Sequence, residues 1–285
     1  MDAKILDGKA LAASIREELR EKTELLKKER GVTPSLAVIV AGDDPASAVY
    51  VRNKERACVN AGMNSIVRRL PGDVTQEELE GVVAGFNADD SVHGILVQLP
   101  LPRHLDEKRV LALIDPKKDV DGFHAVNMGA LMSGTEGFVP CTPKGIICLI
   151  ERAGVSIAGK NAVIVGRSNI VGKPAAMLLL ARDATVTICH SKTRDLASFT
   201  KNADILVAAV GRARMITGDM IKPGATVIDV GINRTDDGLV GDVDFASALP
   251  VAGAITPVPG GVGPMTIAML LENTYIGACA SCAKA

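Results

Sequence analysis

Aromatic residues are scarce in this chain, which has no tryptophan, two tyrosines and five phenylalanines among its 285 residues. Its cores must therefore be aliphatic, and a hydrophobic content of 47% can fill one large core or two modest ones. An excess of charge of one sign is lacking too, because 32 basic side chains meet 33 acidic ones. This balance argues against a nucleic-acid partner.

Long apolar runs and cysteine frameworks are also missing. No run approaches the ~20 residues of a membrane span, and the N-terminal residues lack a signal-peptide core, so we expect a cytoplasmic protein without a membrane partner. Among the six cysteines, Cys279 and Cys282 have a C-x-x-C spacing, but one such pair is weak evidence for a metal or redox site. We expect reduced thiols and no bound metal.

One strand-turn-helix segment stands out. An apolar strand at 163–165 stops at Gly166, crosses a polar turn and enters a helix through Gly172 and Pro174. Backbone amides and the positive end of the helix dipole face such a turn, so the segment predicts a phosphate-binding site. Because Ser168 replaces the second glycine of G-x-G-x-x-G, the turn alone is less specific than the full motif.

Three apolar stretches after this turn predict strands at 185–189, 205–210 and 226–230. With a helix-compatible segment between the first two, they predict a parallel doubly wound sheet that binds a nucleotide at the carboxyl ends of its strands. An NAD site usually has an acidic residue after the second strand, whereas here neutral and basic residues follow it. Arg167 and Lys192 therefore favour NADP; the alternative is that both are ordinary solvated charges.

The first half of the chain also alternates between helices and strands, which predicts a second α/β layer. Asp44 and Pro45 are suited to begin one helix. Thr75 and Glu78 are suited to form the capping box of another. The expected strands are 36–40, 64–70 and 94–98, and the expected helices are 9–30, 46–61 and one between the last two strands.

The helix at 46–61 carries Ser47, Tyr50 and Lys54 at positions i, i+3 and i+7, which share one helical face. A hydroxyl, a phenol and an amine near the carboxyl end of a strand can polarise a substrate or move a proton. The alternative is an extended surface lysine beside a half-buried tyrosine. Tyr-x-x-x-Lys also occurs in short-chain dehydrogenases, but there the phosphate turn precedes the tyrosine, and here the order is reversed.

Two loops add polar groups. Gln98 ends the strand at 94–98, where open parallel sheets bind ligands, although a glutamine there can equally satisfy loop amides. Asp121 lies in a turn with three carboxylates that lacks the other oxygen ligands of a calcium loop. An aspartate that accepts two hydrogen bonds from the amidine-like edge of a heterocycle is the sharper hypothesis.

Prolines and glycines mark the later boundaries. Thr142 is expected to cap a helix whose first residue is Pro143, and we place a domain boundary there. Three prolines and three glycines at 257–264 predict a rigid loop that brings backbone close to a ligand, and a closing helix is expected at 265–276.

Six motifs thus occur in order: Tyr50 with Lys54, Val97 to Pro102, Asp119 to Gly122, Pro140 to Pro143, Gly166 to Pro174, and Pro259 to Pro264. Together they closely resemble the bifunctional methylenetetrahydrofolate dehydrogenase and methenyltetrahydrofolate cyclohydrolase family, over essentially the whole chain. Six ordered motifs are far more specific than any one of them.

The resemblance implies an α/β fold of two domains around a cleft. A folate-binding catalytic domain is expected at 1–139, a Rossmann-like NADP-binding domain at 140–264, and a C-terminal helix and tail at 265–285 that return to the first domain. The implied activity is NADP-dependent oxidation of 5,10-methylenetetrahydrofolate, followed by hydrolysis of the methenyl product to 10-formyltetrahydrofolate, without a metal. Members of the family are typically homodimers.

Residue roles follow from the resemblance by motif position. Lys54 matches the catalytic lysine, Gln98 its hydrogen-bond partner, and Ser47 a helper hydroxyl. Tyr50 matches the residue that stacks on or orients the pterin, and Asp121 matches its anchor. The implied substrate contacts are Tyr50, Lys54, Gln98, Leu99, Asp121, Pro259, Gly260 and Gly261. The implied cofactor contacts are Thr142, Gly166, Arg167, Ser168, Ile170, Val171, Ser191 and Ile232.

A free lysine is protonated at neutral pH because its pKa is ~10.4. Base catalysis by Lys54 therefore requires burial or a bound cation that favours the neutral amine. Two rival functions stay open. A dehydrogenase-only enzyme would share nearly every motif, whereas a non-catalytic NADP-binding module would have no reason to keep Lys54, Gln98 and Asp121 together.

Overall fold

The computed structural model describes residues 2–236 and 238–282, without the side chains of 45–47. The chain forms two compact units, each built on a parallel sheet. The six-stranded unit comprises Met1–Ala12 and Thr142–Thr266, and the three-stranded unit comprises Ala13–Cys141 and Ile267–Ala285. Within the described ranges, no helix is long and apolar enough to cross a membrane.

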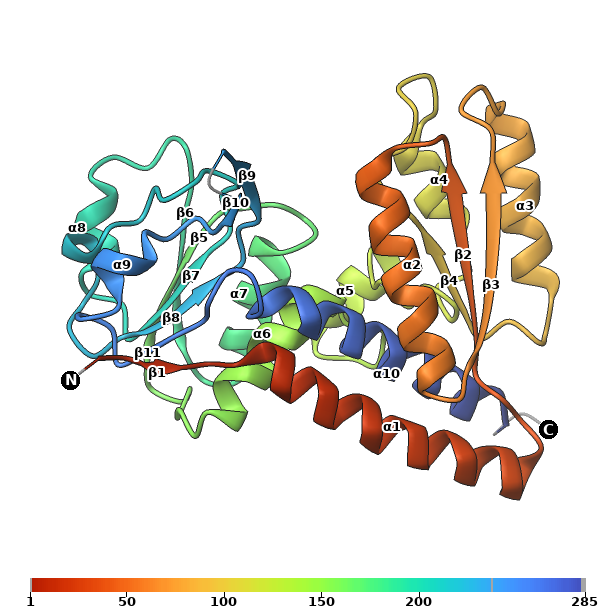
Figure 1. Cartoon of the computed structure of the whole chain (residues 1–285), viewed down its shortest axis with the longest axis horizontal. Helices are drawn as coiled ribbons and strands as arrows, with labels where there is room; N and C mark the ends of the chain where they lie inside the picture. The colour runs from red at the N-terminus through yellow and green to blue at the C-terminus, as the bar shows by residue number, and fades with distance from the viewer. Residues whose placement is uncertain (1, 237, 283–285) are drawn as a thin grey trace. The chain divides into compact units, whose positions relative to one another are not determined.

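In the three-stranded unit, β2 (Ser35–Ala41) lies between β3 (Asn64–Leu70) and β4 (Gly94–Val97). Both pairings are parallel. Strand β2 is buried along its whole length, as its continuous apolar run predicts. The helices of this unit are α2 (Pro45–Asn60), α3 (Gln76–Ala88), α4 (Glu107–Leu113), α5 (Ala125–Ser133) and most of α1 (Gly8–Arg30) and α10 (Val262–Cys282) (Figure 1).

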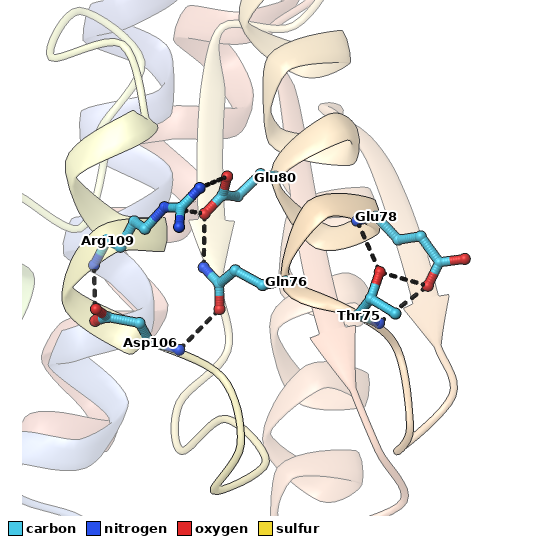
Figure 2. Close-up of polar contacts among 6 residues, drawn as sticks. All are labelled: Thr75, Gln76, Glu78, Glu80, Asp106 and Arg109. Atoms are coloured by element: carbon cyan, nitrogen blue, oxygen red, sulfur yellow. Dashed lines mark hydrogen bonds and ion pairs between the residues drawn. The ribbon is translucent and has the colours of Figure 1, made fainter.

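Helix α3 is fixed by contacts at its start and along its side (Figure 2). The backbone N–H of Glu78 donates to Thr75 Oγ1 at 3.2 Å, and the Glu78 carboxylate accepts from the backbone N–H of Thr75 at 2.9 Å, which confirms the expected capping box. Arg109 of α4 pairs with Glu80 of α3 at 2.6 Å. Both helices are thereby joined over an aliphatic core that includes Leu79.

The six-stranded sheet has the order β1-β11-β8-β7-β5-β6, and all neighbouring strands are parallel. The four longer strands agree with the expected ones to within two residues at each end, which confirms the doubly wound pattern. The elements of this unit are β1 (Lys4–Ile5), α6 (Cys141–Arg152), β5 (Asn161–Val165), α7 (Gly172–Leu180), β6 (Thr185–Cys189), α8 (Leu196–Thr200), β7 (Ile205–Ala208), η1 (Gly218–Met220), β8 (Thr226–Asp229), the antiparallel pair β9 (Asn233–Thr235) and β10 (Gly238–Val240), α9 (Phe245–Ala248) and β11 (Ala254–Ile255).

The start of the chain differs from the sequence-based division. Residues 1–139 were expected in one domain, but residues 1–12 group with the six-stranded sheet. The cause is β1, in which Lys4 lies beside Ala254 and Ile5 beside Ile255 of β11. A two-residue strand is too short to leave a recognisable apolar pattern in the sequence.

Two helix starts also differ from expectation. Helix α6 begins at Cys141, so Thr142 lies inside the helix and is not its N-cap. Helix α10 begins at Val262, three residues before the expected start. In both cases a proline lies in the first helical turn, where backbone N–H groups have no partner within the helix and a missing one costs little.

Candidate active site

Lys54 and Gln98 meet at the carboxyl edge of the three-stranded sheet. Helix α2, which follows β2, carries Lys54, whereas Gln98 comes directly after β4, and its backbone N–H donates to the Ile39 carbonyl at 2.9 Å. Lys54 Nζ donates to Gln98 Oε1 at 3.1 Å. Gln98 Nε2 donates to the Leu99 carbonyl at 2.7 Å, so the amide is fixed with its oxygen towards the amine.

Asp121 reaches the same sheet edge by another route. The segment before it runs beside β4, where the Ile95 N–H donates to the Lys118 carbonyl at 2.7 Å. Burial raises the pKa of Asp121, and the positive charge of Lys54 opposes that rise. The structure thus brings Lys54, Gln98 and Asp121 into one electrostatically coupled group.

The loop that carries Asp121 is held in place by two buried asparagines, Asn127 and Asn273. The Asp119 carboxylate accepts from the His124 backbone N–H and from Asn127 Nδ2, both at 2.8 Å. Asn273 of α10 donates to the Val120 carbonyl at 2.8 Å. The sequence analysis did not assign Asn127 or Asn273 a role, because nothing in the local pattern shows which loop a distant asparagine will contact.

Tyr50 lies one helical turn before Lys54 on α2, and 44% of it is exposed. An exposed phenol ring so close to the amine is available for stacking on a flat ligand. Ser47, the third expected member of this face, has a side chain outside the described part of the structure.

The phosphate turn of the six-stranded unit requires glycine at two positions. Gly166 has φ +135°, and an added Cβ would lie 2.2 Å from the Ala209 carbonyl oxygen; at Gly172 it would lie 2.2 Å from the carbonyl oxygen of Gly166. Ser168 Oγ accepts from the backbone N–H of Val171 at 3.1 Å and of Gly172 at 3.3 Å. Both amides therefore point to Ser168, whereas the sequence analysis had the turn's amides facing an anion.

The expected 2'-phosphate contacts are exposed at neighbouring strand ends. Arg167 follows β5 and Ser191 follows β6, and these two strands pair over their full length. The turn after β6 is closed by a hydrogen bond from the His190 backbone N–H to Thr193 Oγ1 at 2.9 Å. Ile170, at the tip of the phosphate turn, is 46% exposed.

Two buried carboxylates at this sheet edge were missed by the sequence analysis. Asp242 is fully buried and accepts from three successive backbone N–H groups at 210–212, over 2.6 to 2.9 Å, and from Asn233 Nδ2 at 3.0 Å. It therefore ties the loop after β7 to the first residue of β9. Asp242 also packs tightly against Gly231, where an added Cβ would lie 2.2 Å from Asp242 Oδ1, and nothing in the local sequence indicates this contact.

Asp229, the last residue of β8, completes this arrangement. Its carboxylate accepts from the backbone N–H groups of Gly231, Asp242 and Val243 at 2.8 to 3.0 Å. Burial raises the pKa of Asp229 to about 7, against the lowering effect of these donors, and the nearby Asp242 carboxylate raises it further.

Ile232 lies in the loop that Asp229 and Asp242 support. It is 48% exposed, and its Cδ1 would be 3.7 Å from a Cβ added at Gly263. The expected contacts Ile232 and the 259–263 loop therefore lie side by side. Thr142 makes a hydroxyl–hydroxyl hydrogen bond with Thr266 at 2.9 Å, close to the same loop in sequence.

The Pro259–Gly261 loop is held by the first turn of α1. The Lys9 backbone N–H donates to the Gly260 carbonyl at 2.8 Å. Gly8 leaves no room for a side chain, because an added Cβ would lie 1.9 Å from the Gly261 carbonyl oxygen. The first twelve residues thus contribute to the six-stranded unit both a strand and a support for this loop.

Taken together, these features indicate a two-unit α/β enzyme with a parallel sheet of the nucleotide-binding type and a candidate active site around Lys54. Residues 6–121 match the family model of the tetrahydrofolate dehydrogenase/cyclohydrolase catalytic domain, and residues 140–282 match that of its NAD(P)-binding domain. The chain belongs to the tetrahydrofolate dehydrogenase/cyclohydrolase family.

Individual relatives agree with this assignment. The chain is 62% identical to the bifunctional protein FolD of Bordetella avium, with 96% of each chain covered. The bifunctional FolD structure from Campylobacter jejuni is 51% identical, with a TM-score of 0.96 and 98% and 99% of the two chains covered. The Trypanosoma brucei dehydrogenase-cyclohydrolase, solved with NADP and an inhibitor, is 42% identical, with a TM-score of 0.94 and 99% of both chains covered. The resemblance that the six motifs predicted is confirmed.

Proposed function

We propose that this chain oxidises 5,10-methylenetetrahydrofolate with NADP+ and hydrolyses the methenyl product to 10-formyltetrahydrofolate. The observation that carries this proposal is the 3.1 Å contact between Lys54 and Gln98. A neutral carboxamide orients the amine without adding a counter-charge that would hold it protonated. The relatives are named as bifunctional proteins. Their names support a chain with both activities, in preference to a dehydrogenase-only enzyme or a non-catalytic module.

The three-stranded unit binds the folate. Asp121 accepts two hydrogen bonds from the paired N–H donors of the pterin, and the exposed ring of Tyr50 stacks on its flat face. Leu99 lines the site beside Gln98, and Ser47 supplies a hydroxyl. Pro259, Gly260 and Gly261, the remaining substrate contacts that the resemblance implies, belong to the six-stranded unit.

The six-stranded unit binds NADP. Arg167 and Ser191, with Ser168, hold the 2'-phosphate, which an acidic residue after β6 would repel. The backbone of Ile232 contacts the nicotinamide carboxamide. The other cofactor contacts are Gly166, Ile170, Val171 and Thr142.

The chain's own groups account for the proton steps. When bound, NADP+ accepts a hydride from the bridging methylene carbon. Lys54 then removes a proton from the water that attacks the methenyl carbon, and it returns the proton to the ring nitrogen whose bond to that carbon breaks as the ring opens. General acid–base catalysis of this kind typically contributes a factor of about 10² to 10⁴. The cationic methenyl substrate favours the neutral amine that this step needs.

An absorbance assay tests the proposal. Purified protein is incubated with methylenetetrahydrofolate and NADP+, or NAD+ in parallel, and an acid quench then converts formyl product to methenyl. Growth of NADPH without free methenyl before the quench is the expected result. Accumulating methenyl would leave a dehydrogenase only, and no reduced cofactor of either kind would contradict the enzyme assignment.

We further propose that the protein is a cytoplasmic homodimer joined through the six-stranded unit. Its product supplies one-carbon units to purine, methionine and histidine biosynthesis. The balance of 32 basic and 33 acidic residues supports a protein without a nucleic-acid partner. Analytical ultracentrifugation tests the assembly, because a species at 29.7 kDa, the mass of one chain, would contradict the dimer.

A further inference from the structure

A cavity of about 410 Å³ lies at the amino edge of the six-stranded sheet. Its wall includes the first residues of four strands, namely Lys4, Ile205, Thr226 and Ala254. The strands of this sheet are parallel, so their amino ends share one edge and the turns of the cofactor site follow the opposite edge. The cavity is therefore distinct from the site described above.

The charged groups of this cavity do not balance. Three lysines, Lys4, Lys160 and Lys222, line it together with one acidic residue, Asp204. Lys222 Nζ pairs with Asp204 Oδ1 at 2.6 Å, and within the described ranges this is the one ion pair made by a residue of the cavity wall. The wall thus has a formal charge of +2.

The single carboxylate of the cavity wall, that of Asp204, already has hydrogen-bond partners. Asp204 also accepts from the backbone N–H of Asn161 at 2.9 Å. The hydrogen bond from Lys222 and then that from Asn161 lower the pKa of Asp204, and the charges of Lys222 and Lys160 lower it further. Asp204 is therefore ionised and paired with Lys222, which leaves Lys4 and Lys160 without an ion-pair partner among the described residues.

Both remaining ammonium groups have capacity for a ligand. Lys4 Nζ donates to the Ala153 carbonyl at 3.0 Å, a contact that positions it and uses one of its three donors. Lys160 precedes β5 and is half-buried, so its charge is only partly screened by water. A doubly charged anion between them would offset the mutual repulsion of the wall.

We propose that this cavity binds a small dianionic oxyanion, either a phosphate group or a dicarboxylate. Its volume lies within the range of small-molecule sites, about 300 to 1,000 Å³. Lys4 and Lys160 contact the anion directly. Lys222 contributes charge from its fixed place beside Asp204. The inference is independent of the folate and NADP roles proposed above.

Titration calorimetry on the full chain tests this site. The protein is first saturated with NADP+, because the cofactor site also binds phosphate, and is then titrated at constant ionic strength with inorganic phosphate or succinate. Acetate serves as the monoanion control. We expect saturable binding of one dianion per chain, and Lys160→Gln or Lys4→Gln should weaken it by about fivefold or more.

Lys28→Gln is the matched control, since it removes an exposed lysine from α1 outside the cavity. Unchanged dianion affinity in this variant supports the assignment. Binding of phosphate alone identifies a tetrahedral group, and binding of succinate alone identifies a dicarboxylate. Absence of saturable binding, or equal losses in Lys28→Gln and Lys160→Gln, would overturn the proposal. Lys222→Gln is avoided because it leaves Asp204 unpaired.

Discussion

The two sheets of this enzyme differ in the groups that stand out at their carboxyl edges. In the three-stranded unit, the proposed catalytic groups are side chains at the carboxyl edge, with Lys54 hydrogen-bonded to Gln98. In the six-stranded unit, the carboxylates at the same kind of edge are buried, and Asp242 points inward to hold the backbone of the loops. We therefore expect the three-stranded sheet to supply a titratable side chain, and the six-stranded sheet to supply loop backbone held in a fixed shape.

The difference follows from what each ligand needs. A phosphate has its own charge, so fixed backbone and a few exposed polar groups are enough to hold it. Proton transfer requires a titratable side chain at a defined position. Substitutions at Lys54 should therefore abolish a reaction, whereas substitutions at Asp242 should weaken a binding step. The following predictions test that division, from the largest expected effect to the smallest.

Lys54→Met should reduce cyclohydrolase activity by a factor of about 10² to 10⁴, because it removes the proposed general base. NADPH affinity, measured by fluorescence titration, should not change, since Lys54 belongs to the three-stranded unit. Hydrolysis of added methenyltetrahydrofolate, followed by absorbance, gives the rate.

The matched variant is Lys54→Arg. Arginine keeps the positive charge but cannot give up its proton in a protein, so the hydrolysis should be lost here too. Normal hydrolysis in Lys54→Arg would mean that charge alone is required. Loss of NADPH affinity in Lys54→Met would make Lys54 a structural residue.

Asp121→Ala should raise the KM for folate by about 10- to 100-fold, the cost of losing hydrogen bonds to a charged group. The KM for NADP+ should stay constant. Burial raises the pKa of Asp121, so the carboxylate gains a proton above the usual acidic range as the pH falls. The folate KM of the wild type should therefore increase at lower pH, and steady-state kinetics at several pH values would show it. An unchanged folate KM in Asp121→Ala removes the residue from the pterin site.

Asp229 should make the protein less stable as the pH rises from about 4 to about 7. Its pKa is about 7 in the folded chain and 3.8 ordinarily, so between these values the folded state binds more protons than the unfolded state. The free energy of unfolding should fall by about 2 kcal/mol over 1.5 pH units within this window. Urea unfolding at pH 5.5 and pH 7 measures it, and Asp229→Asn should remove the difference. Equal slopes in both proteins would contradict the assignment.

The sequence was sufficient for the regular part of this molecule. Strands such as β2 and β6 are continuous or well-bounded apolar runs, and the capping box of Thr75 depends on residues three apart. Local spacing also placed Tyr50 and Lys54 on one helix. Each of these features is encoded within a few neighbouring residues, which is why a single sequence can reveal it.

Features that depend on distant pairing were not accessible in this way. Strand β1 exists only because β11, some 250 residues later, offers it an edge. Asp242 holds amides 30 to 32 residues before it, and Asn273 reaches a carbonyl 153 residues before it. No local pattern encodes such partners, because an aspartate or asparagine that holds a distant loop looks the same in the sequence as one on a solvated loop.

Asp242→Asn should raise the Kd for NADPH by about tenfold, as one hydrogen-bonded oxygen becomes a donor that faces other donors. The folate KM should remain unchanged, because the loops at 210–212 and 230–233 belong to the six-stranded unit. Asp204→Asn is the control, since Asp204 also accepts a backbone N–H but lies at the opposite edge of the sheet. It should affect stability without affecting the Kd. A loss of stability with no change in Kd for Asp242→Asn would limit that residue to folding.

Thr75→Ala should lower the free energy of unfolding by about 1 kcal/mol, the usual value of an N-cap. Thr75 lies at the start of α3, in the same unit as Lys54, and among the described contacts its hydroxyl is hydrogen-bonded only to Glu78 (Figure 2). Both KM values and both rates should stay at wild-type levels, as measured beside a urea unfolding curve. Thr75→Ser, which retains the hydroxyl, should recover most of the stability. A change in the folate KM would show that the start of α3 affects substrate binding. Side chains that react and side chains that only support the fold could then not be separated within the three-stranded unit.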